Sequence, residues 1–305
     1  MIYRKDVSFK TVDGLTLRGW LYPVEDAGGR APAVVVTPGF NCVKEMFIPQ
    51  VGEYFQSAGI AALLYDPRTL GDSEGLPRNH IDPNLQLSDY SDALSFLLTQ
   101  PDIDPERIAF WGMSFSATIA MCAAAMDTRA KLCIAICPLL DFTFPLTLSR
   151  VLASSMKDRL SQTLGNAPSF IPVLTADGKN PAGLGFQTTT EELDYMMNAK
   201  SRGAPNYENK TTLQSYYKLA VWQPHAIINV MNQKGMGSTK VCMVVPELDQ
   251  ISPPEKQFEL FNTLPEGKES HVAPGKGHLD VLSGEGFEHL MGVQADFLKN
   301  KWLEA

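Results

Sequence analysis

The chain has 305 residues, of which 44% are hydrophobic and 20% are charged. This is the composition of a globular protein and excludes a disordered, collagen-like or fibrous chain. Lys and Arg number 26 against 34 for Asp and Glu, so the formal net charge is −8. An acidic chain of this kind is a poor candidate for binding nucleic acid or an anionic membrane, and we expect neither as a partner.

Membrane and secretion signals are lacking in the sequence. The apolar runs are interrupted by charged residues well before the roughly 18–20 residues that a membrane span needs. The first residues, MIYRKDVSFKTVDG, show no apolar stretch of a secretory signal. Five cysteines, an odd number mostly inside apolar runs, favour buried free thiols in a reducing compartment. We therefore expect a cytoplasmic protein. Since no C-x-x-C pair exists, we expect no structural zinc site, and we predict no other metal and no cofactor.

Strand and helix patterns alternate along the first part of the chain. Two alternating runs around an Asp13-Gly14 turn predict a hairpin over 7–24. Buried strands are then predicted at 32–40, 60–66, 107–111 and 132–140, and helices at 44–59, 85–100 and 116–126. Repeated strand–helix alternation predicts a mostly parallel sheet covered by helices on both faces.

The alternation breaks near residue 143 and returns near 240. It resumes with strands at 241–249 and 269–274 and helices at 253–264 and 285–302. We therefore predict one core domain, formed by 1–142 and 240–305, and a cap inserted at 143–239. A helical patch of the insertion carries apolar residues at i, i+4 spacing, namely Leu148, Leu152, Met156, Leu160 and Leu164. It is either an amphipathic helix lying on the domain or part of a mobile cap over a substrate pocket.

The strongest local signal for chemistry is the run Gly112-Met113-Ser114-Phe115-Ser116, between a buried strand and a helix of small residues. It resembles the nucleophile elbow G-x-S-x-G, in which a serine on a tight turn projects its oxygen above the sheet. The N-terminus of the following helix favours developing negative charge there. Ser116 replaces the second glycine but is still small. We predict that Ser114 is a nucleophile, and the alternative is an ordinary turn serine.

A serine hydroxyl needs a base to take its proton. We predict that this base is His278, which lies in a glycine-bearing loop between the last strand and the last helix. Active-site groups gather in such loops at the edge of a parallel sheet. Asp249, at the end of the strand over 241–249, is predicted to orient the imidazole, with Glu247 as its nearest rival. The competing histidines are His80, His225, His271 and His289.

Acyl transfer also needs N–H donors for the oxyanion. We predict the backbone N–H of Phe115, which follows the nucleophile, and that of Phe40, in the loop after the first parallel strand. Pro38 in that loop has no N–H, and a plain turn is the alternative there. Apolar residues of the insertion are candidates for substrate binding but could equally form the core of the cap: Phe144, Leu148, Tyr195, Tyr217 and Trp222.

At this point the residues resemble the α/β-hydrolase superfamily over essentially the whole chain, including its order Ser…Asp…His. The stretches TPGFNCVKEMF, LYDPRTLGDSEG, WGMSFSAT, PELDQISPPEKQ and GKGHLDVLSGE are similar to fungal α/β-hydrolases encoded with polyketide synthases. The resemblance implies the α/β-hydrolase fold, and it carries nucleophile, acid and base over to Ser114, Asp249 and His278. Four charged residues match a loop of the family, and we interpret them as structural charge pairs: Asp66, Arg68, Asp72 and Glu74.

The function that the resemblance implies is release of a polyketide acyl chain from a carrier protein. The acyl group would leave by hydrolysis, by transfer to an alcohol or by closing a lactone. A carboxylesterase or lactonase acting on small free esters is the alternative. A catalytically dead fold used for binding is a third, against which the complete triad argues. The sequence leaves the acyl chain, the acceptor and the oligomeric state open.

Overall fold

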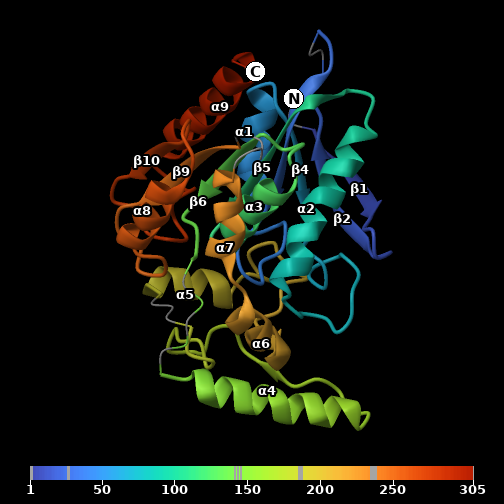
Figure 1. Ribbon diagram of the computed structural model, residues 1–305, viewed down its shortest axis with the longest axis vertical. Helices are drawn as coiled ribbons and strands as arrows, with labels where there is room; N and C mark the ends of the chain where they lie inside the picture. Colours follow the sequence, from blue (N-terminus) through green and yellow to red (C-terminus); the bar gives the residue numbers. More distant parts are fainter. Residues whose placement is uncertain are drawn as a thin grey trace.

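The computed structural model describes residues 3–25, 28–140, 142, 144, 146–184, 188–233 and 239–304. Within these residues the centre is an eight-stranded sheet with the order β1-β2-β4-β3-β5-β6-β9-β10 (Figure 1). β2 pairs antiparallel with β1 and β4, and the remaining neighbours are parallel. The strands are β1 (Lys5–Lys10), β2 (Thr16–Tyr22), β3 (Ala31–Thr37), β4 (Ala61–Tyr65), β5 (Ile103–Met113), β6 (Leu132–Ile136), β9 (Lys240–Pro246) and β10 (Glu269–Ala273). The predicted hairpin and the mostly parallel sheet are confirmed.

Helices cover both faces of the sheet, as the alternating pattern predicts. On one face α1 (Pro49–Ser57) and α9 (Phe287–Leu303) pack against strand residues such as Val36. On the other lie α2 (Pro83–Leu98), α3 (Phe115–Met126) and α8 (Pro254–Thr263). Every residue of α3 from Phe115 to Ala125 is buried, because its small side chains let this helix lie close against the sheet.

The helix predicted over 44–59 begins only at Pro49, so the first five residues of that prediction are wrong. Lys44 is buried and forms ion pairs with Asp66 at 2.8 Å and Asp72 at 2.6 Å. These pairs hold the segment as a turn, in which Phe47 has a φ of 64°. Pro49 then starts the helix, since proline fits the first helical position. The apolar spacing alone did not reveal that Lys44 points inward.

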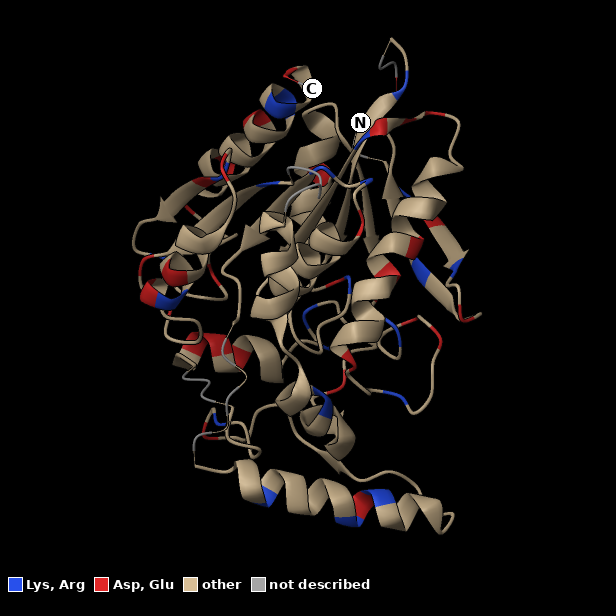
Figure 2. Ribbon diagram, in the orientation of Figure 1, with Lys and Arg blue, Asp and Glu red and all other residues tan. Residues whose placement is uncertain are grey.

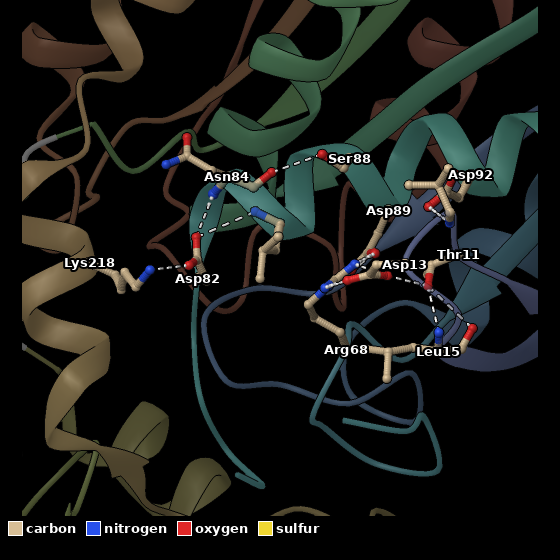
Figure 3. A network of polar contacts seen from close by, with 12 residues as sticks. Thr11, Asp13, Leu15, Arg68, Asp82, Asn84, Ser88, Asp89, Asp92 and Lys218 are labelled. Carbon is tan, nitrogen blue, oxygen red and sulfur yellow. Dashed lines mark hydrogen bonds and ion pairs between the residues drawn. The ribbon is translucent and has the colours of Figure 1, made fainter. Parts of the chain in front are cut away.

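The charged loop after β4 is confirmed as a set of structural ion pairs. Arg68 lies between two carboxylates, with Asp89 of α2 at 2.6 Å and Asp13 of the hairpin turn at 2.8 Å (Figure 3). Glu74 accepts a hydrogen bond from the backbone of Thr16 at 2.7 Å. The loop thus fastens the N-terminal hairpin and α2 to the end of β4.

The stretch between β6 and β9 forms a separate group of short elements, and α4, α5 and α6 lie at the lower end of Figure 1. Its elements are α4 (Leu148–Thr163), β7 (Phe170–Ile171), α5 (Thr190–Met197), β8 (Thr211–Thr212), α6 (Leu213–Val221), α7 (Pro224–Ile228) and a short 3-10 helix (Asn229–Asn232). The predicted break at 143 and the residues just before 239 lie outside the described residues. The division into core and cap at these positions stays a prediction.

The helical patch at 148–164 is a helix, but its apolar stripe does not pack on the domain. Leu160 is 62% exposed and Leu164 74% exposed, and the buried side carries Val151, Ser155 and Asp158. Gln214 of α6 donates to the Asp158 carboxylate at 2.9 Å and to the Ser155 carbonyl at 2.7 Å. Polar groups therefore hold α4 in place, and the amphipathic interpretation is wrong about which face points inward.

The loop before α2 connects this group of elements to the core. Asp82 caps α2, and its carboxylate forms an ion pair with Lys218 of α6 at 2.8 Å (Figure 3). Next to it, the imidazole of His80 hydrogen-bonds Thr212 at 2.8 Å. In the part of the chain that the structure describes, no helix is both long and apolar enough to span a membrane.

Candidate active site

Ser114 occupies a sharp turn between β5, which ends at Met113, and α3, which begins at Phe115. Its φ of 59° and ψ of −124° are strained for a residue with a side chain. The turn brings α3 so close to β5 that a Cβ on Gly112 would lie 2.1 Å from the carbonyl oxygen of Ser116. Position 112 therefore requires glycine. Position 116 tolerates the serine that departs from the motif.

The structure brings together the three residues that the sequence nominates for the triad. The Ser114 hydroxyl lies 2.6 Å from Nε2 of His278, and Nδ1 of His278 lies 2.8 Å from Oδ2 of Asp249. Because a carboxylate only accepts, Nδ1–H donates to Asp249, which leaves Nε2 free to accept from the serine. All three side chains are buried, with Ser114 only 6% exposed. Geometry of this kind permits proton transfer from serine to imidazole.

The Asp249 carboxylate is held on every side. Its Oδ1 accepts from the backbone N–H groups of Ile251 and Ser252, at 2.9 and 2.8 Å. Its Oδ2 accepts from His278 and, at 3.0 Å, from the side-chain amide of Gln257. The rival Glu247 points elsewhere and accepts from the backbone of Gly275 at 2.7 Å.

Gln257 and Cys137 are two neighbours of the triad that sequence reasoning missed. Gln257 lies one helical turn into α8, and the run Pro-Pro-Glu-Lys-Gln contains no signal for an inward amide. Cys137 follows β6 with a φ of 40°, and its thiol lies 3.6 Å from the carbonyl oxygen of His278. Its positive φ, which is rare for a residue with a side chain, could not be foreseen from a cysteine in an apolar run.

Burial disfavours the charged form of His278. The neighbouring Cys137 and Asp249 favour that form more strongly, so the pKa of His278 lies well above its ordinary value of 6.5. Burial also raises the pKa of the Cys137 thiol, which keeps the thiol neutral at neutral pH. Of the two neighbours, the Asp249 carboxylate stabilises the imidazolium both by its charge and by its hydrogen bond with Nδ1.

Cys137, Asp249 and His278 could offer three metal ligands, since their ligand atoms lie within 4.8 Å of one another. Both ring nitrogens of His278 are already engaged, one by Asp249 and the other by Ser114. A buried thiol that stays protonated is also a poor ligand. The chemistry of these donors therefore fits a hydrogen-bonded triad better than a metal site.

The loop after β3 lies directly beside the nucleophile. A Cβ on Gly39 would be 3.3 Å from the Cβ of Ser114, a tight contact, so glycine lets the backbone approach without crowding the nucleophile. Phe40 follows, and its ring meets that of Phe115 edge to face with centroids 5.3 Å apart. The backbone N–H groups of Phe40 and Phe115 thus belong to segments that meet at Ser114. Their role as oxyanion donors stays a prediction.

A narrow apolar cavity of about 50 Å³ lies over Ser114 and His278. It is lined from the core by residues such as Phe40, Phe47 and Leu279, and from the group of elements between β6 and β9 by Val173, Leu174, Thr188 and Met196. None of the five pocket candidates lines it. Tyr195 stacks on Phe47, with ring centroids 4.4 Å apart. Phe144, Leu148 and Trp222 line a second cavity.

Known proteins resemble this chain both in sequence and in structure. The model of the alpha/beta hydrolase family matches residues 34–289. This chain belongs to the alpha/beta hydrolase family. It is 58% identical to a thiohydrolase from Eupenicillium brefeldianum, over 97% of this chain and 94% of the relative.

Two further proteins are also similar to this chain over almost its whole length. The polyketide transferase ATR5 from Stachybotrys chlorohalonatus is 44% identical over 97% of both chains. A solved structure of DcsB in complex with its substrate analogue is 41% identical, covers 98% of this chain and 99% of its own, and has a TM-score of 0.89. The resemblance to fungal α/β-hydrolases and their fold is confirmed, and this alpha/beta hydrolase is an enzyme of the hydrolase or acyltransferase type.

The raised pKa of His278 predicts the acid limb of the pH profile. The base must be neutral to accept the serine proton, so kcat/KM should fall as the pH drops through a value above 6.5. Asp249→Asn removes the carboxylate that holds the pKa up, so the limb should move to lower pH while the plateau falls by roughly 10⁴-fold. Glu247→Gln is the matched control and should keep the wild-type profile. A wild-type limb at or below pH 6.5 would contradict this assignment.

Proposed function

We propose that this enzyme releases a polyketide-type acyl chain from a thioester through an acyl-Ser114 intermediate. The observation that carries the proposal is the unbroken chain of contacts from Ser114 through His278 to Asp249, at 2.6 and 2.8 Å. The names of the thiohydrolase and polyketide transferase relatives support the substrate class. The apolar walls of the cavity over Ser114 suit an acyl chain.

In the first half-reaction the Ser114 oxygen attacks the thioester carbonyl while its proton passes to Nε2 of His278. The oxyanion of the tetrahedral intermediate would accept hydrogen bonds from the N–H groups of Phe40 and Phe115. As the intermediate collapses, the C–S bond breaks and the thiol leaves with the proton from His278. In the second half-reaction His278 takes a proton from water or an alcohol, which attacks the acyl-serine and restores the Ser114 hydroxyl.

Substitution of the nucleophile tests the mechanism. Ser114→Ala should lower turnover of an acyl thioester by about 10⁴-fold or more, and adding His278→Ala should reduce it little further, because triad members act as a unit. A fluorophosphonate probe should label the wild type once, at Ser114, and leave Ser114→Ala unlabelled. Retention of more than a small fraction of turnover by Ser114→Ala would defeat the mechanism. Faster turnover of small aryl esters than of acyl thioesters would favour the esterase alternative.

The second half-reaction decides between hydrolysis and transfer. The small apolar cavity leaves little room for water beside an acyl chain. A hydroxyl held at attack distance has an effective molarity that can exceed by orders of magnitude the roughly 55 M of water. We propose that water resolves simple acyl groups and that a hydroxyl on the chain or an external alcohol competes with it.

A hydroxyacyl thioester should accordingly give some lactone or ester beside the free acid. Met196→Ala should shift the product toward the acid, because it opens the apolar wall near Ser114 to water. Chromatography of the products measures the lactone-to-acid ratio, with the exposed Met197→Ala as the matched control. Free acid as the sole product, at every acceptor concentration, would leave a plain thiohydrolase as the better description.

We also propose that a carrier protein presents the acyl chain, and that it docks on α4. The exposed residues of this helix include leucines together with Arg150, Lys157 and Arg159. Figure 2 shows the blue of Lys and Arg along α4. In the described part of the chain none of these three cations forms an ion pair, although Arg150 donates to the carbonyl of Pro181. On a protein with a net charge of −8, an unpaired basic and apolar helix face suits an acidic helix of a carrier.

Charge reversal on α4 tests this docking face. Lys157→Glu and Arg159→Glu should each lower kcat/KM for a carrier-bound acyl chain by about tenfold, because rim charges steer association. The loss should shrink at high salt and be far smaller with a small-thiol thioester of the same acyl group. Lys299→Glu, on α9 at the other end of the molecule in Figure 1, is the matched control. Equal losses with both substrates would contradict docking on α4.

We also propose that the protein resides in a reducing compartment such as the cytoplasm. All five cysteines are buried free thiols. Such thiols persist where disulfide formation is suppressed.

A further inference from the structure

A second cavity, of about 470 Å³, lies beside the one over Ser114. Its apolar wall includes Phe142, Phe144, Leu219 and Ala220, and Gln223 and His225 add polar side chains to the lining. Its rim includes Lys256 and Glu259 of α8, which form an exposed ion pair at 3.3 Å. The cavity therefore has an apolar interior and a polar mouth at α8.

Aromatic rings separate this cavity from the nucleophile. The ring of Phe115, the residue after Ser114, meets the rings of Phe142 and Trp222 with centroids 5.6 Å away in each case. Phe142 and Trp222 are themselves 5.1 Å apart and line the second cavity. Along the chain, Leu139 lines the first cavity and Leu140 the second. A ligand that occupies both spaces would therefore have to displace the Phe142 and Trp222 side chains.

The two volumes differ in what they can hold. Sites for drug-sized ligands occupy roughly 300–1,000 Å³. The cavity over Ser114, at about 50 Å³, has room for the reacting carbonyl and a few atoms beside it. The second cavity, at about 470 Å³, falls within the range for a long acyl chain.

Trp222 supplies a polar group without a partner. Its side chain is 4% exposed, and its indole Nε1–H has no acceptor among the described residues. An unpaired donor in a buried position costs free energy that a bound oxygen atom would recover. Trp222 therefore offers an unpaired hydrogen-bond donor next to the apolar wall formed by Phe142 and Phe144.

We infer that the second cavity binds the distal part of an acyl chain that carries oxygen, with Trp222 donating to a keto or hydroxyl group. The inference rests on the proposed function, since the chain must be held on Ser114 at its other end. The far end of the chain then reaches water beside the ion pair of Lys256 and Glu259. The cavity thereby selects for long, oxygenated chains over short or purely apolar ones.

Filling the cavity tests chain length. Ala220→Phe should lower the ratio of kcat/KM for dodecanoyl over butyryl thioesters of N-acetylcysteamine by about tenfold, because the new ring occupies the space of the chain. Val221→Phe is the matched control: it is the next residue of α6, 53% exposed and not part of the cavity lining, and it should keep the wild-type ratio. An unchanged ratio in folded Ala220→Phe overturns the inference.

Removing the donor tests the hydrogen bond. Trp222→Phe keeps an aromatic ring, so it should lower the preference for a keto-dodecanoyl over a dodecanoyl chain by about fivefold, the effect of one hydrogen bond. An unchanged preference overturns the role of Trp222.

A crystal structure of the wild type carrying a dodecyl phosphonate on Ser114 gives a direct answer even if Ala220→Phe fails to fold. An alkyl chain between α6 and α8 supports the inference, and a chain elsewhere overturns it. A wild type that turns over no acyl thioester would instead defeat the proposed function, so the two failures are distinguishable.

Discussion

The backbone of Ser114 is the constraint on which the site depends. A φ of 59° is unfavourable for serine, so the surroundings must hold the turn in place. The end of β6 does so on both sides: Ser114 N–H donates to the Ile136 carbonyl at 2.8 Å, and the Leu139 N–H donates to the Ser114 carbonyl at 3.1 Å. Because β6 leads into Cys137 and the wall of the cavity, the same hydrogen bonds fix the nucleophile and its surroundings.

The chemistry follows from where parallel strands end. β3, β5, β9 and β10 run parallel within one sheet, and Phe40, Ser114, Asp249 and His278 come from the loops after their carboxyl ends. Residues far apart in the sequence therefore meet at one edge without any local contact between them. The hydrogen bonds that fix the Asp249 carboxylate come from its own loop and from α8. The position of the acid therefore does not depend on its contact with the histidine.

Sequence-based prediction succeeded where a local constraint admits few residue types. A strand-to-helix turn with Gly112 and Ser114 can be recognised without knowledge of packing, and so can a loop histidine after the last strand. The sheet was predictable because buried strands and small-residue helices have distinct periods. Lys44 escaped prediction because its ion pairs with Asp66 and Asp72 involve residues more than twenty positions away. Gln257 escaped prediction for a different reason: its partner Asp249 is near in sequence but lies across a loop, so no helical spacing links the two.

The helix at 148–163 shows a second limit of prediction from sequence. Spacing of apolar residues predicts which side of a helix is apolar, but not that this side faces the core. Here Asp158 and Ser155 are the inward groups, because Gln214 and the backbone of Ser169 satisfy them with hydrogen bonds. A polar seam of this kind gives less stability than apolar burial would, since hydrogen bonds contribute little net free energy.

Apolar and polar contacts together attach the elements between β6 and β9 to the core. The polar contacts lie next to the start of α2, where Lys218 pairs with Asp82 and His80 hydrogen-bonds Thr212. The apolar contacts lie nearer the nucleophile, where Tyr195 stacks on Phe47 and Trp222 packs edge to face on Phe115. Exposed polar contacts can exchange with water at small cost, whereas apolar packing cannot. The aromatic contacts therefore hold these elements over the strained nucleophile more firmly than the polar contacts at α2 do.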